Sequence, residues 1–171
     1  MLGKKVQQAI DDQINAELYS AYLYLSMSAW FESMNLKGFA NWMRVQYQEE
    51  TFHALKFYDY LLSRQGAVAL AAIGAPPTAW KSPLNAFEET LKHEQHVTSL
   101  IDNLAFLAQE EKDLATGILL QWYVTEQIEE EANAAAILQK LKLAADNPGA
   151  LFMIDNELAA RIYTPPAAAQ A

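Results

Sequence analysis

The 171 residues, of which 52% are hydrophobic and 19% charged, are enough for one domain with a real core and exclude a disordered or fibrous chain. The formal net charge of -9 argues against nucleic acid or an anionic membrane as a partner and favours cations. The chain has no cysteine, which excludes disulfides and thiolate metal sites, and no signal-peptide pattern or long apolar run. We therefore expect a soluble, cytoplasmic protein.

The amino-terminal half is predicted to form two long helices. Apolar residues recur at three- and four-residue spacing, and strand patterns are missing, which predicts an all-α protein. The first helix is expected over residues 5–34, followed by a turn at residues 35–38 in which Asn35 and Gly38 supply the turn chemistry. The second helix is expected over residues 39–65, with Gly66 as its carboxy-terminal cap.

The carboxy-terminal half is predicted to form two more long helices and a short one. A third helix begins at Ser82-Pro83, with Ser82 as cap, and ends near residue 112. Asp113 can cap a fourth helix that ends near residue 145, and Asn147-Pro148 begins a fifth that ends near Arg161. We expect one domain over residues 1–163 and a flexible tail over residues 164–171.

The lengths of the connections predict the topology. Short turns after the first and third helices make each consecutive pair an antiparallel hairpin. Each long helix spans ~40 Å, and the connection over residues 67–81 can reach roughly 50 Å when extended. The predicted fold is a four-helix bundle of two antiparallel hairpins joined by a long crossover, plus the short fifth helix.

The two hairpins carry a similar set of polar residues, separated by 77 positions. The corresponding pairs are Glu17 and Glu94, Glu49 and Glu126, Glu50 and Gln127, and His53 and Glu130. The hairpins are therefore approximate copies, and both polar sets are expected to meet near the middle of the bundle.

Four glutamates of this set share their helix faces with apolar residues at 100° per residue. They are Glu17, Glu50, Glu94 and Glu130. A single glutamate on a long helix is usually solvated, but four buried carboxylates without Lys or Arg on their faces require another source of positive charge. Two divalent ions would balance their charge, and His53 lies on the same side as Glu50. Oxygen ligands with one nitrogen favour iron or manganese at a dinuclear site.

Three longer motifs surround these residues: QINAELYSAYLYLSM around Glu17, NWMRVQYQEETFHA around Glu50 and His53, and QWYVTEQIEEEANA around Gln127 and Glu130. With them, the chain resembles the non-haem prokaryotic ferritins, which belong to the ferritin-like di-iron carboxylate proteins, over nearly its whole length. The resemblance implies iron storage and detoxification in a hollow homo-oligomeric cage, usually of 24 subunits. It also implies ferroxidase activity, the oxidation of Fe(II) to a stored ferric mineral with O2 or H2O2.

The resemblance also assigns roles to residues. Glu17, Glu50 and His53 match the ligands of the first ferroxidase iron, and Glu50 bridges to a second iron held by Glu94 and Glu130. The resemblance also assigns roles near the iron pair to five further residues: Tyr24, Gln127, Glu49, Glu126 and Glu129. Tyr24 matches a tyrosine beside the pair and Gln127 a polar neighbour of the second iron, while the three glutamates resemble ligands of a possible third iron.

Other readings of these residues stay open. A solvated helix face would also explain the acidic cluster, and packing would explain Tyr24 and Trp122, for which we also considered a redox role. Haem is not expected, because Thr51 follows the shared glutamate where bacterioferritins have a haem-ligating Met. His93 and His96, which point away from the face of Glu94, are expected at the surface.

Three alternative functions compete with ferritin. A di-iron oxidase or peroxidase that stores nothing would share the ligands, although a rubredoxin-like cysteine domain is missing from the chain. A DNA-protecting miniferritin would place its iron sites between subunits and often carries a basic tail, unlike this chain. An inert helical interaction module would tolerate replacement of all five predicted ligands.

Overall fold

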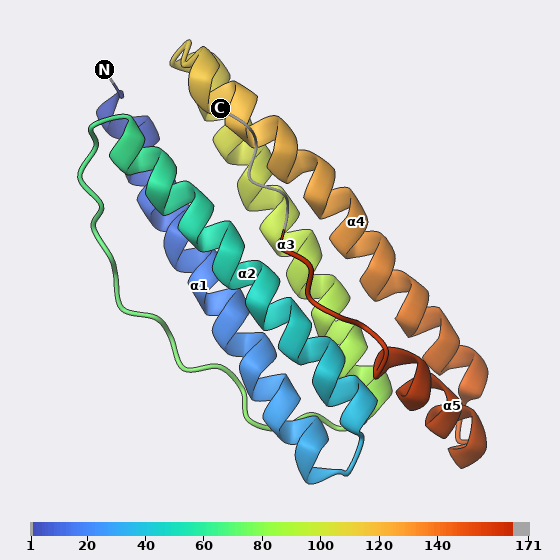
Figure 1. The fold of residues 1–171 in the computed structure, drawn as a ribbon. Helices are drawn as coiled ribbons and strands as arrows, with labels where there is room; N and C mark the ends of the chain where they lie inside the picture. Colours follow the sequence, from blue (N-terminus) through green and yellow to red (C-terminus); the bar gives the residue numbers. More distant parts are fainter. Residues whose placement is uncertain (1, 166–171) are drawn as a thin grey trace.

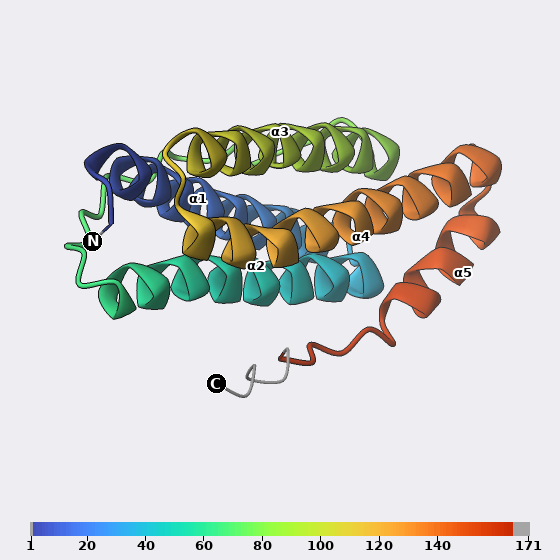
Figure 2. The ribbon, with the colours of Figure 1, turned by 90° about the horizontal axis from the view of Figure 1, so that it is seen from above.

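The computed structural model describes residues 2–165, which form five helices and no strand. The helices are α1 (Lys4–Ser33), α2 (Lys37–Ser63), α3 (Pro83–Glu110), α4 (Leu114–Ala144) and α5 (Pro148–Leu158). Figure 1 shows two antiparallel hairpins, α1 with α2 and α3 with α4, and Figure 2 shows α2 and α3 on opposite sides of the bundle. The predicted all-α bundle with a short fifth helix is confirmed. The predicted tail lies outside the described residues from residue 166 onward.

The crossover over residues 67–81 runs along the outside of α1 and makes α2 and α3 parallel, as predicted (Figure 1). Polar side chains of α1 hold it in place. Gln7 Nε2 donates to the Ala67 carbonyl at 3.1 Å, and Ser26 Oγ donates to the Pro77 carbonyl at 2.6 Å. Between them, Asp11 Oδ1 accepts the backbone N–H of the crossover at residue 69. These bonds satisfy backbone groups of a segment that has no regular structure of its own.

Side-chain caps begin three helices as the sequence predicts. Ser82 accepts the N–H of Asn85 at the start of α3, Asp113 accepts that of Thr116 at the start of α4, and Asn147 caps α5. Most helix ends lie within two residues of the predicted ones. The exception is α5, which ends at Leu158, so Arg161 lies in an irregular segment instead of at a helix end.

The predicted roles of two glycines in turns were wrong. The left-handed residue after α2 is Gln65, with φ of 58°, whereas Gly66 has no positive φ and donates its N–H to the Leu61 carbonyl at 2.9 Å. Gly38 lies in the first turn of α2, where a Cβ atom would come within 1.6 Å of the carbonyl oxygen of Asp155. Gly38 is therefore required by the close approach of α5, while the turn itself uses Asn35, with φ of 59°.

The core consists of two apolar clusters, one toward each end of the bundle. One contains Phe31, Phe39 and Phe87, which pack with ring centroids 5.1 to 6.4 Å apart. The other contains Phe57 stacked on Tyr123, with ring centroids 3.9 Å apart. None of the described helices is both long and apolar enough to cross a membrane.

Candidate metal centre

Five predicted ligands from four helices lie between the two apolar clusters, and each is at most 5% exposed. They are Glu17 on α1, Glu50 and His53 on α2, Glu94 on α3 and Glu130 on α4. These residues are buried because each lies on the apolar face of its helix, as the helical periodicity predicts. Four carboxyl groups and one imidazole therefore share a water-poor interior, which is costly unless their charge is compensated.

Glu17, Glu50 and His53 form the tightest part of this group. Each offers a ligand atom, and these atoms all lie within 4.8 Å of one another. Nδ1 of His53 lies 3.5 Å from Oε2 of Glu50. Among the described residues, Oε2 of Glu17 and Oε2 of Glu50 are buried and have no hydrogen-bond partner. Two unpartnered carboxylate oxygens beside an imidazole fit a divalent cation, which would supply the missing interaction.

Glu94 and Glu130 form the other half, and polar side chains orient them. The Tyr24 hydroxyl donates to Oε1 of Glu94, and Gln127 Nε2 approaches Oε2 of the same carboxyl group at 3.4 Å. Gln46 Nε2 donates to Oε2 of Glu130 at 2.8 Å. Tyr24 and Gln127 therefore both act on Glu94, and the second half has more hydrogen-bond donors than the first.

Burial changes the proton affinity of these carboxyl groups. It is the main cause of the rise in the pKa of Glu94 from 4.5 to about 8, and the charge of Glu130 adds to it while Tyr24 opposes it. The pKa of Glu50 is raised well above its usual value, first by burial and then by the charges of Glu94 and Glu17. Without metal, the site therefore retains protons near neutral pH, and a bound cation would displace them.

We expect the metal-free protein to lose stability as the pH rises from 6.5 to 8. In this window the folded protein retains the Glu94 proton, which an unfolded chain with a pKa of 4.5 has released. The free energy of unfolding then falls as the pH rises, by up to about 1.4 kcal/mol per pH unit for each such group. Denaturant unfolding in the presence of a chelator measures the slope. Glu94→Gln should reduce the slope, and an increase in stability with pH would contradict the prediction.

Aromatic residues fix the position of His53. The Tyr123 hydroxyl donates to the backbone carbonyl of His53 at 2.8 Å, and the Trp122 ring packs edge-on against the imidazole with centroids 5.4 Å apart. Lys56 Nζ lies 4.3 Å from the centroid of the Trp122 ring. Packing accounts for the position of Trp122, and its redox role stays a prediction.

The three additional glutamates lie at the edge of the site. Glu49 and Glu126 are half-buried, and Glu129 is exposed. Burial raises the pKa of Glu49 to about 7, a rise that Arg161 opposes and that the charges of Glu130, Glu126 and Glu129 increase. Within residues 2–165, only Glu17, Glu50 and His53 bring three ligand atoms within 4.8 Å of one another. Glu49, Glu126 and Glu129 are close enough for their charges to interact but do not form a compact group of ligands.

His93 was wrongly predicted to be a surface residue. It is half-buried, its Nε2 lies 2.8 Å from Ser20 Oγ, and its ring centroid is 6.0 Å from that of Tyr24. Burial, followed by the charge of His96, lowers the pKa of His93 to about 4. The rotation of about 100° away from the face of Glu94 points His93 toward α1 instead of solvent. His96 is exposed, as predicted.

Two buried glutamines support the site and were not identified from the sequence. Gln13 Nε2 donates to Oε1 of Glu17 at 2.8 Å, and Gln46 contacts Glu130 as described above. Spacing gave a signal for Gln13, which lies one helical turn before Glu17. It gave none for Gln46, because its contact joins α2 to α4 and depends on how the hairpins pack.

Comparisons with known proteins agree with the fold described above. Residues 7–144 match the ferritin family, described as a ferritin-like domain. The chain is 45% identical over 161 residues to a bacterial non-heme ferritin of Bacteroides fragilis (strain 638R), covering 94% of this chain and 100% of the relative. It is 39% identical over 163 residues to a bacterial non-heme ferritin of Staphylococcus saprophyticus, covering 95% and 98% respectively.

Solved structures with the same fold include two forms of the Archaeoglobus fulgidus ferritin. A closed form engineered by site-directed mutagenesis has 51% identity and a TM-score of 0.95, covering 96% of this chain and 100% of that chain. The open-pore ferritin has 51% identity and a TM-score of 0.94, covering 95% and 99% respectively. With the family match and the near full-length relatives, they confirm the resemblance found in the sequence, and the chain belongs to the ferritin family of iron-storage proteins.

Proposed function

We propose that each subunit oxidises Fe(II) at a di-iron site inside its own helical bundle and passes Fe(III) to a stored mineral. The observation that carries this proposal is the pair of buried, unpartnered oxygens, Oε2 of Glu17 and Oε2 of Glu50, beside His53. Such oxygens gain most from a cation, and no Lys or Arg forms an ion pair with either carboxylate among the described residues.

The ligands divide unequally between the two iron ions. The first ion takes Glu17, Glu50 and His53, and Glu50 bridges to the second. The second ion takes Glu94 and Glu130 and therefore has only oxygen ligands from these side chains, with the amide of Gln127 nearby. A site without the imidazole should bind its ion more weakly, which favours release of oxidised iron toward storage.

The reaction needs two electrons from two ions held close together. Each Fe(II) loses one electron, and O2 takes up both electrons and two protons to give H2O2, so superoxide is not released. Peroxide can serve as the oxidant in the same way. Tyr24 donates a hydrogen bond to Oε1 of Glu94, and the longer contact of Gln127 Nε2 with Oε2, at 3.4 Å, would give way to a metal ion. We propose that Tyr24 also donates an electron.

Storage requires many subunits. We propose a homo-oligomeric cage of 24 subunits that works in the cytoplasm without haem. Support comes from the family match and from solved neighbours described as open-pore and closed forms of a ferritin. Glu49, Glu126 and Glu129 would bind a third iron ion beside the pair. Because the curated relatives are named ferritins, storage is favoured over an oxidase that stores nothing.

Replacing His53 with Ala tests the proposal. We expect the variant to bind one Fe(II) ion less tightly in an anaerobic titration and to oxidise Fe(II) at least about tenfold more slowly when oxygen is admitted, because the nitrogen ligand of the first ion is lost. His96→Ala is the matched control, since His96 is an exposed histidine on α3. Unchanged oxidation in His53→Ala would remove this ligand assignment.

A further inference from the structure

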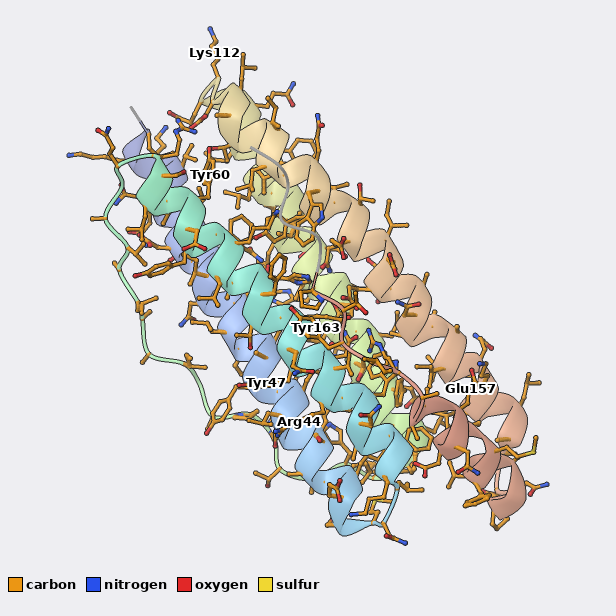
Figure 3. All side chains as sticks on the ribbon, viewed as in Figure 1. Arg44, Tyr47, Tyr60, Lys112, Glu157 and Tyr163 are labelled. Carbon is orange, nitrogen blue, oxygen red and sulfur yellow. The ribbon has the colours of Figure 1, made fainter. Side chains whose placement is uncertain are left out.

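The segment that follows α5 returns along the bundle and contacts α2. Figures 1 and 2 show it alongside α2, on the side away from α3, and Figure 3 labels Tyr163 on this segment. Asn41 Nδ2 anchors it by donating to the carbonyl oxygens of Leu158 at 3.2 Å and Arg161 at 2.9 Å. The segment over residues 159–165, called the return segment below, is therefore held at a defined place on α2.

Arg161 is the charged residue of the return segment, and two residues of α2 fix its side chain. Its Nη2 donates to Oε2 of Glu49 at 2.7 Å, and its guanidinium lies 4.7 Å from the centroid of the Trp42 ring. The side chains of Arg161 and Glu49 are only 21% and 24% exposed. Trp42 and Glu49 lie seven residues apart and thus on one face of α2, so the planar guanidinium of Arg161 can contact both side chains at once.

The Arg161 guanidinium lies close to a cluster of acidic side chains. Glu49 lies within the electrostatic range of Glu126, Glu129 and Glu130 on α4. Arg161 satisfies only part of its own hydrogen-bonding capacity there, because Nη1 is buried and has no partner among residues 2–165. A permanently charged group that uses one of its two terminal nitrogens is well placed to balance Glu49 and can be replaced by a better cation.

We propose that Arg161 competes with the third iron ion for Glu49, so that this ion binds only when the return segment releases Glu49. The inference rests on the proposed function, in particular on the third iron ion at Glu49, Glu126 and Glu129, and adds a control on how many ions each subunit holds. With Arg161 on Glu49, the cluster of Glu49, Glu126 and Glu129 carries one negative charge less and lacks a free ligand. Binding of the third ion and detachment of the return segment are then one coupled equilibrium.

Anaerobic Fe(II) titration calorimetry of the full-length protein tests the competition. We expect Arg161→Gln to tighten the third binding event about fivefold, because the competing ion pair is gone, and to leave the first two events within twofold of the parent. Arg161→Lys keeps the charge and should stay closer to the parent. Glu49→Gln should remove the third event in both backgrounds.

Hydrogen exchange of the parent protein gives a second measurement that does not depend on any variant. Exchange over residues 159–163 should rise with the third equivalent of Fe(II) and stay unchanged with the first two. An unchanged or weaker third event in Arg161→Gln, or a third ion that binds without faster exchange, would overturn the proposal. Absence of the first two events in the parent would instead contradict the di-iron site itself.

Discussion

Replacing Glu50 with Gln is expected to abolish most Fe(II) oxidation while stabilising the metal-free protein. Glu50 is 1% exposed, is the ligand proposed to bridge both ions, and has an Oε2 atom with no described hydrogen-bond partner. Loss of its charge should lower the initial oxidation rate at least about 100-fold, as expected for a ligand shared by two ions. Without metal, the buried carboxyl group of Glu50 must take up a proton on folding because its pKa is raised well above its usual value, whereas Gln is neutral in both states. The free energy of unfolding without metal should therefore rise by about 1–2 kcal/mol.

Opposite signs for activity and stability distinguish a metal ligand from a packing residue. Stopped-flow oxidation and denaturant unfolding at pH 7 with a chelator measure the two effects separately. Glu88→Gln on the exposed face of α3 is a suitable control and should change neither quantity. If Glu50→Gln were less stable than the parent without metal, the cost of burying this carboxyl group inferred from the site would be wrong.

The second large effect is expected for Gly38→Ala, far from the ligands. A Cβ atom at this position would lie 1.6 Å from the backbone oxygen of Asp155, so α5 must move away from α2. The movement would also break two hydrogen bonds in which Oδ1 of Asp155 accepts the N–H groups of Gly38 and Phe39, at 2.8 and 3.0 Å. The combined loss of packing and of this cap should lower the free energy of unfolding by about 3 kcal/mol.

Gly117→Ala provides the matched control. Gly117 is also helical, but a Cβ atom there would meet no atom within 4 Å. Because alanine favours a helix, this variant should gain about 0.5–1 kcal/mol. Unfolding midpoints at one fixed protein concentration compare the two variants, and hydrogen exchange should place the damage of Gly38→Ala in α5. Equal stabilities for both would show that α5 adjusts without cost.

The fold was largely predictable because its signals are local. Ser82, Asp113 and Asn147 each begin a helix through contacts within three residues, and helical periodicity extends almost unbroken between them. The crossover is long enough to span the bundle, which predicts two antiparallel hairpins with α2 and α3 parallel. The role of Gly38 could not be predicted in this way, because the atom that excludes a side chain there belongs to Asp155, 117 residues away.

The candidate site was predictable where one helix face carries the information. Glu17, Glu50, Glu94 and Glu130 were found because each interrupts an apolar stripe. Tyr24 and Gln127, which contact Glu94 across helices, were found only through the family resemblance, and three other contacts between elements were not identified. The orientation of Gln46 toward Glu130, of His93 toward Ser20 and of Arg161 toward Glu49 depends on how hairpins and the return segment pack, which periodicity does not describe.

The division of the core into two apolar clusters has a mechanical consequence. The apolar clusters hold the bundle together at both ends, and the polar residues lie between them. We expect the carboxylates between the clusters to change rotamer as ions bind and leave, on the fast timescale of side chains, while the helices keep their spacing. The two apolar clusters would then let the proposed site bind and release ions repeatedly without loosening the bundle.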